Sequence, residues 1–325
     1  MKKQVLALGL TLISVPALSA APSAARKSCL PQRYSVTAIP LRPAAINQSG
    51  EVVGTTPSHK SSIWSRQRGL QEIQVPPGFT DAEGVALNSA GQVIGTAIDR
   101  RNSRRQGFTY TDGRLTMLSD GAKALAINDA GMIAGEARNS KGISGPVLWK
   151  GPTPLELGGC CGGTAVAINN RGEAVGEVYD QQSHYHAFEW DKTKGLRQIG
   201  PPGDFSSAVL LNDAGEYVLR SFPGGLLLYR DGIATHLSLA PKAPSHPKAM
   251  NSCGAIVGSY GIFADYYRAF AWDETGGFRD LNTLVPANSG WTLQEATGIN
   301  DRGQIVGWGT FQKQEDAGFL LTPVD

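Results

Sequence analysis

One motif recurs seven times along the chain, and it constrains the fold more than any other feature. The motif is an apolar residue, most often Ile or Leu, then Asn, two further residues and Gly, followed by an apolar run that usually ends in a second Gly. The seven asparagines are Asn47, Asn88, Asn128, Asn169, Asn212, Asn251 and Asn300. They lie 41, 40, 41, 43, 39 and 49 residues apart. A repeat near 40 residues that holds several short strands is typical of a β-propeller blade.

The chemistry of the Asn-x-x-Gly step explains why it repeats. An Asn side chain can accept a hydrogen bond from the backbone two residues further on, which starts a turn. Gly at the fourth position supplies the left-handed conformation that follows a type I turn and makes a bulge. We therefore expect pairs such as Asn47 and Gly50 to build hairpin turns rather than a binding site.

Each unit carries three or four predicted strands, and the third ends on aromatic residues, as in Phe188 to Trp190. These rings are expected to pack between blades, because they bury large areas. The seventh unit stops after Gly318–Leu321, and the segment Tyr34–Pro40 at the other end of the chain offers the missing strand. The sequence predicts an all-β, seven-bladed β-propeller of four-stranded blades over residues 34–325. Pairing of the N-terminal strand with the C-terminal blade would close the ring and remove an open edge.

The repeat resembles the HAF repeat of bacterial exported proteins, which is named after a His-Ala-Phe strand. The tripeptide stands intact as His186-Ala187-Phe188 and varies to Arg268-Ala269-Phe270, while the fourth-strand element Asp-Leu-Gly is reduced to Glu156-Leu157-Gly158. The resemblance covers about Tyr34 to Val324. It implies a propeller and export, and the family carries no assigned catalytic activity.

The first 20 residues have the pattern of a signal peptide. Lys2 and Lys3 precede an apolar stretch from Val5 to Leu18, and Leu18-Ser19-Ala20 offers a cleavage site near Ala20. The apolar stretch is too short to span a bilayer well. We expect a signal peptide at 1–20, an N-terminal segment at 21–33, a periplasmic or secreted mature protein, and no membrane insertion.

The balance of charge argues against nucleic acid as a partner. The formal charge is +2 for the whole chain, and it falls to zero without Lys2 and Lys3. A neutral protein has no overall field that would gather a polyanion. No dinucleotide, phosphate-loop or zinc-protease motif occurs, and no cofactor is expected.

Strand alternation places all seven Asn turns on one face of the predicted ring, which we call the Asn face. The opposite face, the loop face, carries the loops between strands two and three and the connections between blades. Varied loops on a rigid scaffold are where binding usually occurs, and Arg and aromatic residues are enriched in protein interfaces. The candidate binding residues on the loop face are Arg100, Arg101, Arg104, Arg105, Tyr179, Tyr185, Phe263, Tyr266, Trp291, Trp308 and Phe311.

The loop face allows three other interpretations. The four arginines could bind an anionic partner, although they form a single loop in a neutral protein. His184 and His186 could ligate a metal, but no further ligand follows at a suitable spacing, so a structural role is favoured and no metal site is expected. Acidic residues from several blades could converge as in an enzyme, and the candidates with His184 are Asp99, Asp180, Asp265 and Asp316.

The four cysteines allow three full pairings. Cys29 and Cys253 are both expected on the Asn face of neighbouring blades, which favours a Cys29–Cys253 disulfide. Cys160 and Cys161 lie on the loop face among glycines. They could form a vicinal disulfide or stay as two free thiols.

Together these features favour an exported, non-catalytic binding module. A protein partner is preferred to a glycan, and an inhibitory or protective role toward an exported protein is one form of it. The alternative is a hydrolase or lyase of envelope polymer with acidic residues near the central channel.

Overall fold

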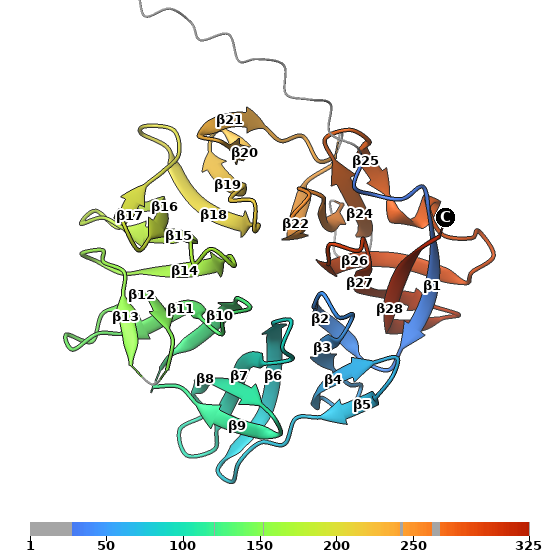
Figure 1. Ribbon diagram of the computed structural model, residues 1–325, viewed down its shortest axis with the longest axis horizontal. Coiled ribbons are helices and arrows are strands. Elements are labelled where there is room, and N and C mark those ends of the chain that lie inside the picture. The colour runs from blue at the N-terminus through green and yellow to red at the C-terminus, as the bar shows by residue number, and fades with distance from the viewer. Residues whose placement is uncertain (1–27, 120, 152, 241–242, 262–266, 325) are drawn as a thin grey trace, which may run out of the picture.

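The structure is a computed structural model that describes residues 28–119, 121–151, 153–240, 243–261 and 267–324. Its strands form seven four-stranded antiparallel sheets arranged in a ring around a central axis (Figure 1). This arrangement confirms the predicted seven-bladed β-propeller. The expected signal peptide lies outside the described residues, as do the candidates Phe263, Tyr266 and Asp265.

The strands of the first four blades follow one another along the chain, from the innermost to the outermost. Blade 1 holds β2 (Arg42–Ile46), β3 (Val52–Thr55), β4 (Ser61–Ser65) and β5 (Gly69–Glu72). Blade 2 holds β6 (Phe79–Leu87), β7 (Val93–Asp99), β8 (Arg105–Thr111) and β9 (Arg114–Met117). Blade 3 holds β10 (Lys123–Ile127), β11 (Ile133–Arg138), β12 (Ser144–Trp149) and β13 (Pro154–Glu156). Blade 4 holds β14 (Gly163–Ile168), β15 (Ala174–Tyr179), β16 (Tyr185–Asp191) and β17 (Gly195–Gln198).

Blades 5 and 6 keep the same order, and blade 7 combines both ends of the chain. Blade 5 holds β18 (Phe205–Leu211), β19 (Tyr217–Phe222), β20 (Gly225–Arg230) and β21 (Ile233–His236). Blade 6 holds β22 (Ser245–Met250), β23 (Ile256–Tyr260), β24 (Arg268–Asp273) and β25 (Gly277–Asp280), and the short 3-10 helix η2 (Leu281–Thr283) follows it. Blade 7 holds β26 (Trp291–Ile299), β27 (Ile305–Phe311), β28 (Gln314–Val324) and β1 (Arg33–Ile39).

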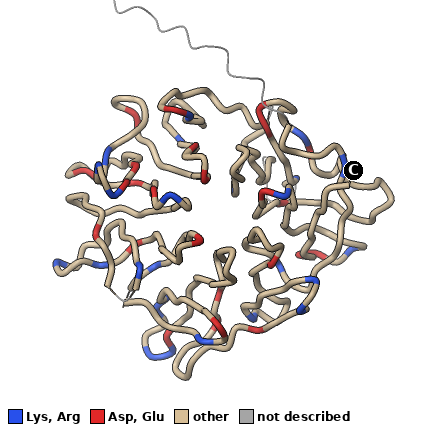
Figure 2. Tube along the Cα trace, viewed as in Figure 1, with Lys and Arg blue, Asp and Glu red and all other residues tan. Residues whose placement is uncertain are grey.

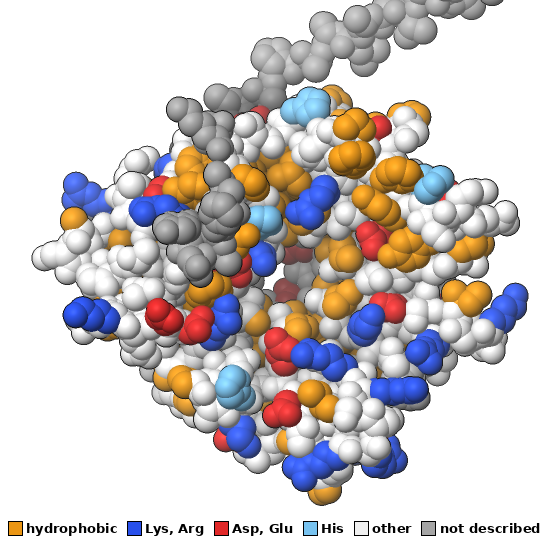
Figure 3. Space-filling view, turned by 180° about the vertical axis from the view of Figure 1, so that it is seen from behind, with side chains coloured by type: hydrophobic (Ala, Val, Ile, Leu, Met, Phe, Trp, Pro, Cys, Tyr) orange, Lys and Arg blue, Asp and Glu red, His pale blue; other side chains and the backbone are white. Residues whose placement is uncertain are grey.

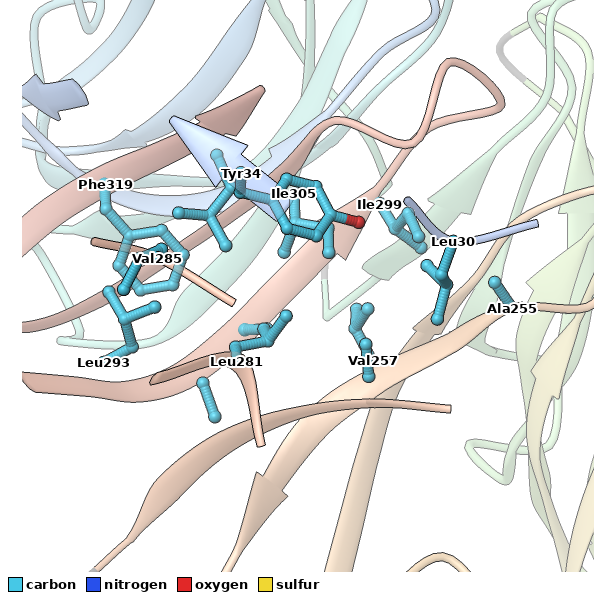
Figure 4. Packing of buried hydrophobic residues seen from close by; sticks show 14 residues of the cluster. Leu30, Tyr34, Ala255, Val257, Leu281, Val285, Leu293, Ile299, Ile305 and Phe319 are labelled. Carbon is cyan, nitrogen blue, oxygen red and sulfur yellow. The ribbon is translucent and has the colours of Figure 1, made fainter. Parts of the chain in front are cut away.

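The ring closes as predicted, by antiparallel pairing of β1 with β28. The register runs from Arg33 opposite Val324 to Ile39 opposite Gly318. Leu30 and Tyr34 are buried in the core between blades 6 and 7, where they pack among residues such as Leu281 and Ile305 (Figure 4). Residues 30–39 therefore add both a strand and core side chains to the closing blade.

Each repeated Asn makes two kinds of hydrogen bond, and only one of them is local. In blade 1, Asn47 Oδ1 accepts from the backbone N–H of Ser49 at 3.0 Å and of Glu51 at 2.9 Å, which confirms the predicted turn. Its Nδ2 donates across the blade boundary to the carbonyl oxygen of Asn88 at 2.9 Å. The same inter-blade bond recurs at all seven boundaries, at 2.9–3.3 Å, and ends with Asn300 donating to Asn47. The seven asparagines thus form a closed ring of hydrogen bonds on the Asn face.

The second glycine of the motif lets the first two strands of a blade come close together. In blade 4, Gly176 lies opposite a bulge of β14 between Ala165 and Ala167. A Cβ at Gly176 would overlap the carbonyl oxygen of Thr164 and press on the ring of Phe188. Phe188 is fully buried and packs with Leu148 of the preceding blade, as expected for the aromatic strand.

The described residues include no helix that is long and apolar enough to cross a membrane. Lys and Arg lie interspersed with Asp and Glu round the ring (Figure 2).

Candidate functional site: the loop face

A large pocket opens on the loop face where blades 7, 1 and 2 meet. It has a volume of about 1130 Å³ and is lined by the first strands of these blades, by β27 and β28 of blade 7, by the β3–β4 loop, by the connection between β1 and β2, and by the start of β8. Arg105, Trp308 and Phe311, three of the predicted binding residues, line this pocket. The Asn face differs, because its seven turns are hydrogen-bonded to one another.

Arg42 and Trp308 contact each other in the lining of the pocket. The Arg42 guanidinium carbon lies 4.1 Å from the centre of the Trp308 ring, a cation–π arrangement. Arg42 Nε also lies 3.7 Å from the Asp316 carboxylate, and both side chains are about half exposed or more. On its other side the Trp308 indole N–H donates to Glu295 at 3.4 Å. The half-buried Trp308 is therefore held by two charged neighbours, one on its face and one at its edge.

Arg105, at the start of β8, lines the pocket from blade 2. Its guanidinium pairs with Glu83 at 3.0 Å, and this ion pair is also more than half exposed. Exposed pairs of this kind contribute about 0–1 kcal/mol, so they can exchange for contacts with a partner at low cost.

The four-arginine loop folds around Asp99. Arg101 binds the Asp99 carboxylate at 2.6 Å, and its backbone N–H donates to the same group at 2.9 Å. These hydrogen bonds hold the pKa of Asp99 below its usual range. Arg100 and Arg104 are exposed, and no ion pair joins either of them to another described residue. The loop thus presents Arg100 and Arg104 to solvent, while Arg101 and Arg105 already have acidic partners.

Trp291, at the start of β26, packs against the pocket residue Phe311. Its ring stacks on Phe311 at a centroid distance of 4.7 Å and meets Phe319 edge-on at 5.9 Å. Trp291 is half-buried and supports Phe311 rather than lining the pocket itself.

Tyr179 and Tyr185 lie apart from the pocket, on blade 4. Both are 37% exposed, and Tyr185 contacts the ring of Phe205 at 5.6 Å. Phe222, at the end of β19 in blade 5, is 69% exposed. Hydrophobic side chains gather over these two blades at the upper right of Figure 3, whereas charged side chains dominate the lower half over blades 1 and 2. The predicted residues therefore fall into a charged pocket and a separate aromatic patch.

The rings of His184 and His186 both contact Asp180, which begins the turn between β15 and β16. The Asp180 carboxylate lies 3.4 Å from His184 and 3.2 Å from His186, and it accepts backbone N–H groups of Gln182 and His184. Burial alone would raise the pKa of Asp180, but hydrogen bonds from the His184 backbone and the His186 ring hold it below its usual range. Within the described ranges, no group of three or more His, Cys, Asp or Glu side chains could hold a metal.

The acidic residues considered for catalysis are not brought together in the part of the chain that the structure describes. Asp99 is bound within its own turn on blade 2, Asp180 within its turn on blade 4, and Asp316 lies beside Arg42 on blade 7.

Sequence reasoning missed Arg42 as a site residue, although the repeat contained a signal for it. The residue five positions before each motif Asn is polar or charged in every blade, and none of the seven is buried, whereas the next residue is always buried. The set is Arg42, Glu83, Lys123, Thr164, Ser207, His246 and Glu295. This column faces away from the core at the loop-face end of the innermost strands. Phe205 and Phe222 were missed because they lie at strand ends, outside the repeated pattern.

The four cysteines form two disulfides, one of which was expected. Cys29 and Cys253 are joined across a sequence separation of 224, with Cα atoms 6.1 Å apart. Cys160 and Cys161 form the vicinal disulfide that the sequence left open.

No protein-family model matches the chain, and no curated protein has a similar sequence. Solved structures share its fold at low identity. Virginiamycin B lyase from Staphylococcus aureus is 13% identical, with a TM-score of 0.53, over 90% of this chain and 100% of that one. A YCF48 structure, solved bound to a D1 peptide, is 10% identical with a TM-score of 0.55, over 90% and 97%.

An acylaminoacyl peptidase from Pyrococcus horikoshii is 12% identical, with a TM-score of 0.50, over 74% of this chain. The match spans only 45% of that enzyme's length. These similarities establish the seven-bladed fold, and they include both enzymes and a peptide-bound protein.

Proposed function

We propose that the chain is an exported HAF-repeat protein that binds another protein through its loop face. Export to the periplasm or the medium is supported by the apolar N-terminal sequence. The Cys29–Cys253 disulfide is compatible with an oxidising compartment. The peptide-bound YCF48 structure supports the idea that a propeller of this kind can receive a polypeptide.

The observation that carries the proposal is the pocket between blades 7, 1 and 2. It combines the features of an interaction site: a large hollow, a half-buried Trp308, and exposed Arg42 and Arg105 whose ion pairs are weak. Arg100 and Arg104 extend the same side of the loop face with cationic groups that can reach a partner.

The arrangement favours a protein over a glycan. Arg42 covers one face of the Trp308 ring at 4.1 Å and the ring is half-buried, which reduces the indole surface on which a sugar could stack. The charged groups around it are instead suited to a polypeptide that carries both acidic and basic side chains.

Binding should be tested with loop-face variants against a partner captured from envelope extract by the mature protein. Trp308→Ala should raise the Kd at least about tenfold, because truncating a buried interface Trp typically costs more than 1–2 kcal/mol. Arg100→Ser/Arg104→Ser should slow association and weaken its dependence on salt. Thermal unfolding of both variants should stay close to that of the wild type.

The matched control removes two arginines from the Asn face, Arg114→Ser/Arg302→Ser, which changes the net charge equally. We expect this control to bind like the wild type. Equal losses in the loop-face and control pairs would mean that the loop face has no special role.

A further inference from the structure

The connection between blades 3 and 4 presents an exposed pair of bonded cysteines. Cys160 and Cys161 are adjacent, disulfide-linked and exposed on the loop face. The four glycines around them, Gly158, Gly159, Gly162 and Gly163, have φ values of +113°, +99°, +120° and +144°. Only glycine adopts these angles easily, so this backbone path is specific to the sequence Gly-Gly-Cys-Cys-Gly-Gly.

The Cys160–Cys161 disulfide contributes little to the stability of the fold. A disulfide stabilises a protein mainly by restricting the unfolded chain, and the effect grows with the loop that it closes. Cys29–Cys253 closes a loop of more than 200 residues and ties the N-terminal segment to blade 6. Cys160–Cys161 closes only the small ring that contains the peptide bond between the two cysteines, and it links no two secondary-structure elements.

The difference in sequence separation also affects how easily each disulfide is reduced. Folding brings Cys29 and Cys253 together from far apart in sequence, so the native structure favours their oxidised form. Cys160 and Cys161 are neighbours in any conformation, so folding adds little. Their Cα atoms are 3.8 Å apart, which is the fixed spacing of consecutive residues, so the bond brings together nothing that the chain itself does not already hold together.

We propose that Cys160–Cys161 is a site of thiol–disulfide exchange, and that its substrate is an external dithiol. A thiolate of the dithiol attacks one sulfur, the S–S bond breaks, and the other cysteine leaves as a thiolate. The second thiol of the reductant then resolves the mixed disulfide. The protein gains two electrons and two protons, and the dithiol is oxidised to a disulfide.

The position of the pair links this chemistry to the loop face. The carbonyl of Gly162 accepts the backbone N–H of Tyr179 at 3.2 Å, and Cys160 Sγ lies 3.7 Å from the carbonyl oxygen of Tyr179. Reduction therefore opens the ring between the two cysteines directly beside Tyr179, which belongs to the aromatic patch.

The test is graded reduction of the mature protein with dithiothreitol, followed by alkylation and peptide mass spectrometry. We expect Cys160 and Cys161 to be half alkylated at a dithiothreitol concentration at least about tenfold below that needed for Cys29 and Cys253. Thermal unfolding should not change at the first step and should shift downward at the second. Cys160→Ser/Cys161→Ser should lack the first step and keep the unfolding temperature of the wild type.

Three outcomes would overturn the proposal. Both pairs could be reduced together, Cys29–Cys253 could be reduced first, or Cys160 and Cys161 could be alkylated without any reductant. None of these depends on whether a partner binds the loop face, so this test stands apart from that of the proposed function.

Discussion

At the scale of single residues, the repeated Asn has a role that local sequence could not reveal. The turn was predictable, because Asx turns depend only on the residues of the motif itself. The inter-blade bond from Nδ2 was not, since Asn128 and its acceptor Asn169 are 41 residues apart and meet only in the closed ring. The motif therefore specifies a side chain with both an acceptor and a donor, which explains why Asp does not replace Asn in any of the seven turns.

Asn128→Asp removes the side-chain donor of Asn128 and keeps its acceptor oxygen. The carboxylate can still accept the turn hydrogen bonds, but it cannot donate to Asn169 and it places a charge in a buried site with 4% exposure. We expect the free energy of unfolding to fall by about 1–3 kcal/mol, as measured by urea denaturation.

Asn139→Asp is the control in the same blade. Asn139 accepts from Lys141 and Ile143 in the same way, at 3.0 Å, but it lies in an exposed loop. An Asn128→Asp protein that is as stable as the Asn139→Asp protein would refute the role of the inter-blade ring.

At the scale of elements, strand number and ring closure followed from the sequence, but the details of the blades did not. The unpaired third strand of the last unit and the spare N-terminal strand were visible as complementary segments, and β1 and β28 pair as expected. Each innermost strand also carries a bulge three residues before the motif Asn, which was not predicted, because it depends on the register of two strands and not on the turn residues. Blade 5 has Leu219 in place of the second Gly and still forms four strands, so that glycine is favoured by close packing without being essential in every blade.

Deleting residues 30–41 tests the closing element. The deletion removes β1 together with the buried Leu30 and Tyr34, and it exposes the edge of β28. Exposed edges promote association between chains. We expect aggregation in size-exclusion chromatography or a large drop in thermal stability, and unchanged melting of a monomer would contradict ring closure by β1.

At the scale of the whole molecule, the two faces of the ring divide structure from proposed function. Hydrogen bonds between blades occupy the turns of the Asn face, whereas the loop face carries the pocket, the arginine loop and the aromatic patch. The sequence predicted this division from strand alternation. It could not predict that Arg105 and Trp308 share one hollow while Tyr185 lies elsewhere, because distances across the ring depend on how seven blades pack.

Site-specific photo-cross-linking tests the central claim that the loop face binds a protein. A benzoylphenylalanine residue would be placed at Arg104, Tyr185 or Phe311 on the loop face, and at Ser49, Asn170 or Arg302 on the Asn face. After illumination of cells that export each variant, we predict covalent protein adducts from loop-face positions and none from Asn-face positions. Adducts formed at Ser49, Asn170 or Arg302, with none from the loop face, would contradict the account.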